Sequence, residues 1–102
     1  MKLEGKIAVV TGASKGIGAG IAKALGAQGA TVIVNYASSQ IEADALVAHI
    51  TGQGGSAYAL QADMSIGADV VRLLDTVKAE HGTLDILVNN AAIVPFIAWD
   101  DV

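Results

Sequence analysis

The sequence predicts an α/β fold, a doubly wound parallel sheet covered by helices. It is 53% hydrophobic but only 4% aromatic and contains 12 glycines, a composition of small and aliphatic residues that suits buried parallel strands packed against helices. Four short apolar runs recur about every 25 residues and alternate with helical patterns. The 102 residues are enough for one domain, covering residues 1–102.

The expected strands are the apolar runs Ile7 to Val10, Ala30 to Val34, Ala57 to Ala62 and Leu84 to Val88. Between them, apolar residues follow helical spacing at Ile17, Ile21 and Leu25, at Ala43, Leu46, Val47 and Ile50, and at Val70, Leu73, Leu74 and Val77. With right-handed crossovers, this β-α-β-α-β-α-β string forms one parallel sheet. We expect strand order 3-2-1-4, with a crevice at the carboxyl ends of strands 1 and 4, where the winding reverses.

Polar and glycine residues mark the expected helix ends. Ser39 and Glu42 have the spacing of a capping box, and Ser65 is placed to cap the third helix. Gly29 and Gly82 stand where a left-handed C-terminal cap is expected. These residues predict the boundaries between helices and loops.

A glycine-rich turn, Thr11 to Gly18, joins the first strand to the first helix. The unpaired N–H groups at the start of such a helix, and its partial positive charge, attract a phosphate above the turn. Glycine permits close approach of the backbone and unusual φ values. The turn therefore predicts a pyrophosphate site, although a merely tight turn between strand and helix remains the alternative.

Three segments together give a specific resemblance. The motif Thr11-Gly12-x3-Gly16-Ile17-Gly18, Asp63 after the third strand, and Leu87-Val88-Asn89-Asn90-Ala91-Ala92 after the fourth resemble the short-chain dehydrogenase/reductase family. The resemblance spans the chain and is greatest for the 3-oxoacyl-(acyl carrier protein) reductase-like group. It implies a Rossmann-type fold and hydride transfer between a nicotinamide and a carbonyl or secondary alcohol, with this chain supplying the amino-terminal, cofactor-binding part.

The resemblance also implies roles for particular residues. Asp63 would accept from the adenine amino group with Met64 against the base, although Asp63 is also placed to cap the next helix. Asn89 is expected to brace the strands. The expected cofactor-binding residues are Gly12, Ser14, Lys15, Gly16, Ile17, Gly18, Asn35, Tyr36, Ala37, Ser38, Asp63, Met64, Asn90, Ala91 and Ala92. Ala92 replaces the family's usual glycine, and we expect the crevice to be retained despite this change.

The end of the second strand indicates the choice of cofactor. A carboxylate there would bind the ribose 2′-hydroxyl of NAD and repel a 2′-phosphate, but this chain has Asn35-Tyr36-Ala37-Ser38-Ser39. The serines are hydroxyl donors, and Lys15 supplies a cation. NADP(H) is therefore favoured, with NAD(H) as the alternative.

We expect no catalytic residue within these 102 residues. The family's proton-transfer pair is Tyr-x3-Lys, but Tyr36 is followed four positions later by Gln40, and Tyr58 by Ala62. Two hypotheses follow: the cofactor half of an oxidoreductase, truncated at Val102 and inactive alone, or a stand-alone nucleotide-binding module. A receiver-type signalling domain is discounted because Thr11-Gly12 replaces its acidic cluster.

Charge and composition narrow the partners and the compartment. The net charge is −4, with the six basic residues scattered, so no basic patch is expected to bind nucleic acid. We expect no metal site and no membrane partner, and the absence of cysteine fits a reducing compartment such as the cytoplasm. The expected partners are a small-molecule carbonyl or alcohol substrate and further copies of the chain in a homo-oligomer.

Overall fold

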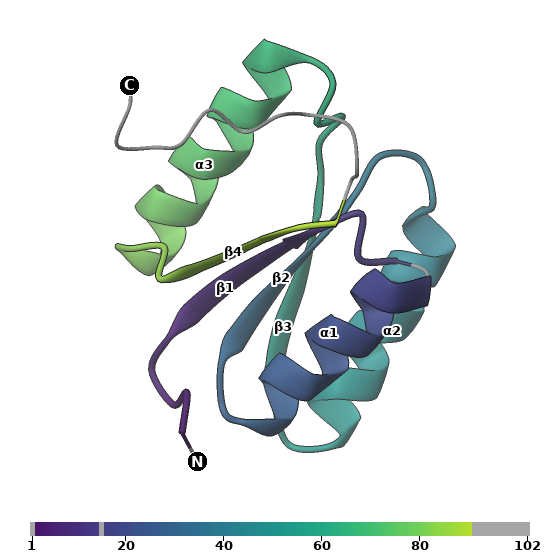
Figure 1. Ribbon diagram of the computed structural model, residues 1–102, viewed down its shortest axis with the longest axis vertical. Helices are drawn as coiled ribbons and strands as arrows, with labels where there is room; N and C mark the ends of the chain where they lie inside the picture. The colour runs from purple at the N-terminus through teal and green to yellow at the C-terminus, as the bar shows by residue number, and fades with distance from the viewer. Residues whose placement is uncertain (1, 15, 91–102) are drawn as a thin grey trace.

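Strands and helices alternate along the chain (Figure 1). The computed structural model describes residues 2–14 and 16–90. The elements are β1 (Ile7–Thr11), α1 (Gly16–Ala27), β2 (Thr31–Tyr36), α2 (Gln40–Gly52), β3 (Ser56–Gln61), α3 (Gly67–His81) and β4 (Ile86–Asn89). Each expected strand is present, and no strand end differs from the prediction by more than two residues.

The four strands form one parallel sheet in the order β3-β2-β1-β4. Val9 in β1 lies opposite Ile33 in β2 and Leu87 in β4, which fixes the register on both sides of the central strand. Helices α1 and α2 cover one face and α3 covers the other (Figure 1). The predicted α/β architecture and the strand order 3-2-1-4 are confirmed.

Buried aliphatic side chains fill both faces of the sheet. All five residues of β1 are buried, and they alternate between faces: Ala8 and Val10 pack toward α1 and α2, whereas Ile7 and Val9 pack toward α3. A strand with both faces covered needs apolar residues at every position. This requirement explains the continuous apolar runs in the sequence.

Two of the predicted caps are wrong. Ser39 is the N-cap residue of α2 but makes no side-chain cap bond, and the N-cap of α3 is Ile66. The Ser65 hydroxyl instead donates to Asp63 Oδ1 at 2.6 Å, so a bond within the loop replaces the expected cap. Gly82 does end α3 in the left-handed conformation, with φ of 81° and its N–H bonded to Lys78 O.

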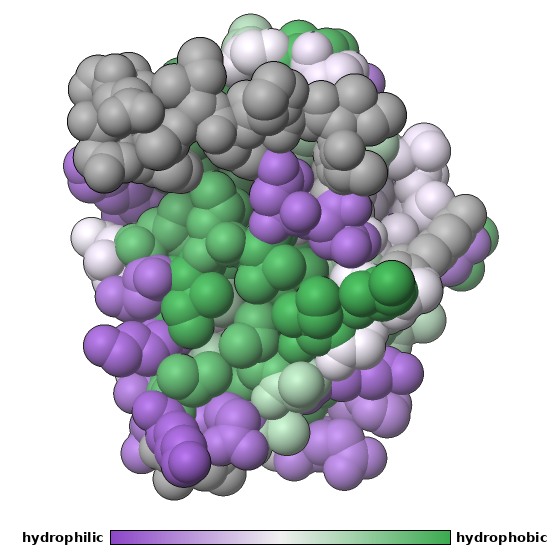
Figure 2. Space-filling model, in the orientation of Figure 1, coloured by the Kyte–Doolittle hydropathy of each residue, from purple (hydrophilic) through white to green (hydrophobic). Residues whose placement is uncertain are grey.

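Strand β4 lies at one edge of the described sheet, beside β1 alone. Figure 2 shows apolar side chains gathered over β4, β1 and the adjoining surface of α1. The half-buried apolar residues there include Ile21, Leu25, Ile86 and Val88. An apolar edge strand without a covering element is a template for pairing with another chain.

We expect the 102-residue chain to self-associate through β4. The Asp85 N–H bonds Ile7 O, so by alternation along a strand the Ile86 N–H faces away from β1. Ile86→Pro removes that donor at the first residue of the strand, where proline is tolerated, and should reduce association in sedimentation velocity. Ile86→Val retains the donor and serves as the control; a wild-type chain that stays monomeric at high concentration would contradict the expectation.

Candidate dinucleotide site

Backbone and side-chain hydrogen bonds join β1 to β4 at their carboxyl ends. Thr11 is fully buried, and its hydroxyl oxygen lies 3.1 Å from Asn89 Oδ1 and 3.3 Å from Val88 O, as donor to either. The same oxygen accepts the Asn90 N–H at 2.9 Å. Asn90 Nδ2 in turn donates to Gly12 O at 3.3 Å. The expected bracing role of Asn89 thus has a partner in Thr11, and the two ends that form the crevice are held together.

The side chain of Asn35 holds the start of the glycine turn from the opposite side. Its Oδ1 accepts the Gly12 N–H at 3.2 Å, and its backbone oxygen accepts the Ala13 N–H at 3.0 Å. Its Nδ2 donates to Leu60 O and Ala62 O at 3.3 and 3.1 Å. Asn35 is only 1% exposed, so its amide bonds to protein groups, and direct contact with a cofactor stays a prediction.

The turn leads into the amino terminus of α1. Gly12 and Gly16 have φ of 58° and 59°, a region that side chains disfavour. Ser14 is half-buried, while Gly16 is exposed and Ile17 is 77% exposed. An exposed isoleucine at the first turn of a helix, above backbone N–H groups, offers apolar surface beside an anion site. The turn therefore leaves the amino terminus of α1 open to solvent, with an apolar side chain beside it.

Gly18 packs more tightly than any other glycine of this turn for which neighbours are described. A Cβ atom at this position would lie 2.6 Å from Asn90 Nδ2 and 2.7 Å from Gly12 O. Because one of these atoms is backbone, the turn would have to shift to accept a side chain. Gly18 therefore lets α1 approach the ends of β1 and β4.

Asp63 lies at the end of β3, half-buried, in the loop before α3. Hydrogen bonds from the hydroxyl and then the N–H of Ser65 lower the pKa of Asp63 below its ordinary value, because both favour the charged carboxylate. Asp63 therefore does not cap α3. Met64 is 7% exposed and packs into the core beside α3, so its contact with an adenine base stays a prediction.

The loop after β2 is open to solvent. Tyr36 is half-buried against the core, whereas Ala37 and Ser38 are exposed. The Gln61 side chain donates to Ala37 O at 3.0 Å, and Arg72 in α3 donates to Gln61 O at 2.8 Å. Sequence reasoning did not identify Gln61 or Arg72, because such contacts follow no local spacing rule.

Three expected residues, Lys15, Ala91 and Ala92, lie outside the described residues. The others come from the carboxyl ends of β1, β2, β3 and β4 and the start of α1, which the fold places at one end of the sheet (Figure 1). In residues 2–14 and 16–90, no three His, Cys, Asp or Glu side chains group to hold a metal. No helix in that part of the chain is long and apolar enough to cross a membrane.

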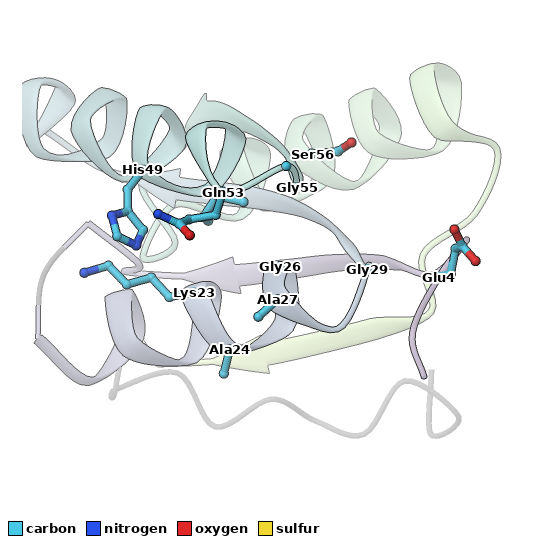
Figure 3. Close-up of a pocket in the computed structure, with 12 residues that line it drawn as sticks. Glu4, Lys23, Ala24, Gly26, Ala27, Gly29, His49, Gln53, Gly55 and Ser56 are labelled. Carbon is cyan, nitrogen blue, oxygen red and sulfur yellow. The ribbon is translucent and has the colours of Figure 1, made fainter. Parts of the chain in front are cut away.

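A cavity of about 820 Å³ opens at the other end of the sheet (Figure 3). It lies between the carboxyl ends of α1 and α2, and its polar lining includes Glu4, Lys23, His49 and Gln53. Ile50 packs at its base, where a Cβ on Gly26 would lie 2.8 Å from Ile50 Cγ2. This cavity is separate from the crevice, and helix carboxyl ends disfavour anions. The crevice therefore remains the candidate dinucleotide site.

The family model for short chain dehydrogenases matches residues 6–101. This chain belongs to the short-chain dehydrogenase family. It is 55% identical over 101 residues to an uncharacterized oxidoreductase of Methylorubrum extorquens, and 46% identical over 101 residues to the short-chain dehydrogenase/reductase homolog YusS of Bacillus subtilis. A crystal structure of a short chain dehydrogenase from Burkholderia cenocepacia in complex with NADP superposes with a TM-score of 0.85 at 47% identity.

The lengths of these relatives differ. The chain is covered at 99% or more in all three comparisons, but it spans 41% of the Methylorubrum protein and 42% of the Burkholderia chain. It spans 93% of YusS. The family membership and the fold are therefore shown, and the activity of a longer protein is a matter for proposal.

Gly18→Ala should weaken binding of a dinucleotide, because its Cβ displaces Gly12 or Asn90 from the crevice. Overpacking of this kind costs about 1 to 3 kcal/mol, which is roughly thirtyfold in affinity at the middle of that range. Fluorescence titration with NADPH measures the effect. Gly20→Ala is the matched control, since nothing lies within 4 Å of its Cβ position; equal affinities of both variants would show that close packing at Gly18 does not shape the site.

Ser65→Ala should raise the pKa of Asp63 toward its ordinary value by removing the hydroxyl donor. Because the native pKa is depressed, the stabilising effect of these bonds is present above the ordinary pKa and is lost as pH falls through the lowered one. Carbon-13 NMR titration of the Asp63 carboxyl measures the change. Thr76→Ala, which removes a hydroxyl bonded to Arg72 O, should leave it unaltered; an unchanged pKa in Ser65→Ala would reject the assigned cause.

Proposed function

We propose that this chain is the cofactor-binding half of an NADP(H)-dependent short-chain dehydrogenase/reductase. Such a protein transfers hydride between the nicotinamide and a carbonyl or secondary alcohol. The observation that carries the proposal is the glycine turn, which Asn35 and Asn90 hold at Gly12 from two sides beneath the amino terminus of α1. Membership of the family gives that turn its chemical meaning.

The residues of the crevice fit a dinucleotide in order along its edge. The N–H groups of the first turn of α1 would bind the pyrophosphate, since Asn35 already accepts those of Gly12 and Ala13. Asp63 would accept a hydrogen bond from the adenine amino group, and Ile17 would provide apolar surface. Asn90, with Ala91 and Ala92 after it, would line the nicotinamide side. In this arrangement Asn35 acts on the cofactor through the turn that it holds.

The loop after β2 supports NADP(H) over NAD(H). Ala37 and Ser38 are exposed there, no carboxylate occupies residues 35–39, and Lys15 adds a cation to the glycine turn. The Burkholderia structure, with 47% identity, contains NADP. NAD(H) would bind the same turn but would lack the contact to its 2′-position.

We place substrate binding and proton transfer outside this chain, because it contains no Tyr-x3-Lys pair. The partners we propose are a small-molecule carbonyl or alcohol and other copies of the chain, and the compartment is the cytoplasm. Within the family we propose the 3-oxoacyl-(acyl carrier protein) reductase-like group. The second candidate, a stand-alone nucleotide-binding module, gains support from the similar length of YusS.

NADPH should bind more tightly than NADH, and Lys15→Ala should reduce that preference. Loss of a charge-assisted bond to the 2′-phosphate would weaken the binding of NADPH by about 1 to 3 kcal/mol and leave the binding of NADH unchanged. Fluorescence titration of both cofactors provides the measurement, with Lys23→Ala on the exposed side of α1 as the control. NADH binding as tight as NADPH binding would overturn the proposed cofactor.

The 102-residue chain should not oxidise NADPH with any carbonyl substrate. Bound cofactor alone provides no proton for the alkoxide that forms. Absorbance at the NADPH band, followed with a purified chain of confirmed mass, should remain at background. Reproducible turnover would show that a proton donor exists within these residues and that our placement of the chemistry is wrong.

A further inference from the structure

One guanidinium in α3 connects the two loops that flank the adenosine end of the crevice. Arg72 Nη2 donates to Gln61 O at 2.8 Å and to Gln61 Oε1 at 3.3 Å. It also lies 3.7 Å from Asp69 Oδ2 in an ion pair. All three contacts involve the same nitrogen, Nη2 of Arg72. Gln61 and Asp69 therefore both depend on one position of the arginine side chain.

Each partner of Arg72 holds a different loop. Gln61 Nε2 donates to Ala37 O at 3.0 Å, in the loop after β2. Asp69 Oδ2 accepts the Asp63 N–H at 2.8 Å, in the loop after β3. Both loops leave the sheet at the end where α3 begins (Figure 1). The chain of contacts therefore runs from Ala37 through Arg72 to Asp63.

We propose that Arg72 is a positioning residue for the adenosine end of the cofactor. It acts through Gln61 on the loop that faces the ribose 2′-position and through Asp69 on the loop that carries Asp63. This role rests on the proposed function, since it assumes that a dinucleotide occupies the crevice. It differs from a role as a phosphate ligand, because Arg72 here bonds to protein groups.

The two roles predict different cofactor profiles. A positioning residue shapes the site for the adenosine moiety, which NADPH and NADH share. Replacing such a residue therefore lowers the affinity for both cofactors equally. A ligand of the 2′-phosphate would affect NADPH alone. The side chain of Arg72 is 46% exposed, so it can be replaced without opening the core, and the fold should remain intact.

Arg72→Met should lower the affinity for both NADPH and NADH by roughly threefold to tenfold, which is the range for losing one net hydrogen bond. Lys78→Met is the matched control: Lys78 lies in the same helix and is exposed, and the substitution removes the same charge and introduces the same residue. Gln61→Met should weaken both cofactors as well. The double variant should lose less than the product of the two single losses, because the residues act in one chain of contacts.

A second readout needs no cofactor. In the free protein, the Asp63 N–H should exchange with solvent faster in Arg72→Met than in the wild type or in Lys78→Met, because Asp69 loses the group that holds it. Unchanged exchange and unchanged affinities would overturn the proposal, and a loss confined to NADPH would replace it with direct phosphate contact. A wild-type chain that binds neither cofactor would instead reject the proposed function along with it.

Discussion

The side-chain amide of Asn35 is the interaction on which the arrangement of the site depends. It links the ends of three strands, accepting from Gly12 after β1 and donating to Leu60 and Ala62 at the end of β3, while its own backbone ends β2. Only a carboxamide offers one acceptor and two donors in one short side chain. Aspartate would lose both donors, and leucine would lose all three bonds, at about 0.5 to 1.5 kcal/mol for each.

The bonds of Asn35 also give neighbouring residues at the end of β2 different roles. Because Asn35 is buried and bonded to protein groups, it fixes the glycine turn, whereas the side chains of Ala37 and Ser38 are exposed to solvent. A carboxylate at position 35 would place a negative charge against two carbonyl oxygens. The buried amide is therefore compatible with the proposed preference for a phosphorylated ribose, since it keeps charge away from the strand end.

Much of the fold could be predicted because it depends on local patterns. Buried parallel strands require apolar residues at successive positions, as in β1, and the glycines of the turn are needed for φ near 60° at Gly12 and Gly16. The order of the strands followed from the doubly wound pattern, in which the winding reverses between strands 1 and 4.

Other features depend on partners far apart in the sequence, and local patterns do not reveal them. The sequence places Asn35 at the end of the second strand, but it does not reveal the bonds of this side chain to Leu60 and Ala62. The sequence favours Ser65 as the cap of α3, yet the N-cap is Ile66, one residue later, and the Ser65 hydroxyl donates to the Asp63 carboxylate in the preceding loop. The contacts of Arg72 likewise depend on how α3 packs over the end of β3.

The most direct test of the central claim is a crystal structure of this chain grown with NADPH. The account predicts that the pyrophosphate lies over residues 12–18 at the amino terminus of α1, that the adenine lies beside Asp63, and that the Asn35 amide keeps its bonds to Gly12, Leu60 and Ala62. A cofactor bound in the cavity between α1 and α2, or a glycine turn that leaves Asn35 when the cofactor binds, would contradict it.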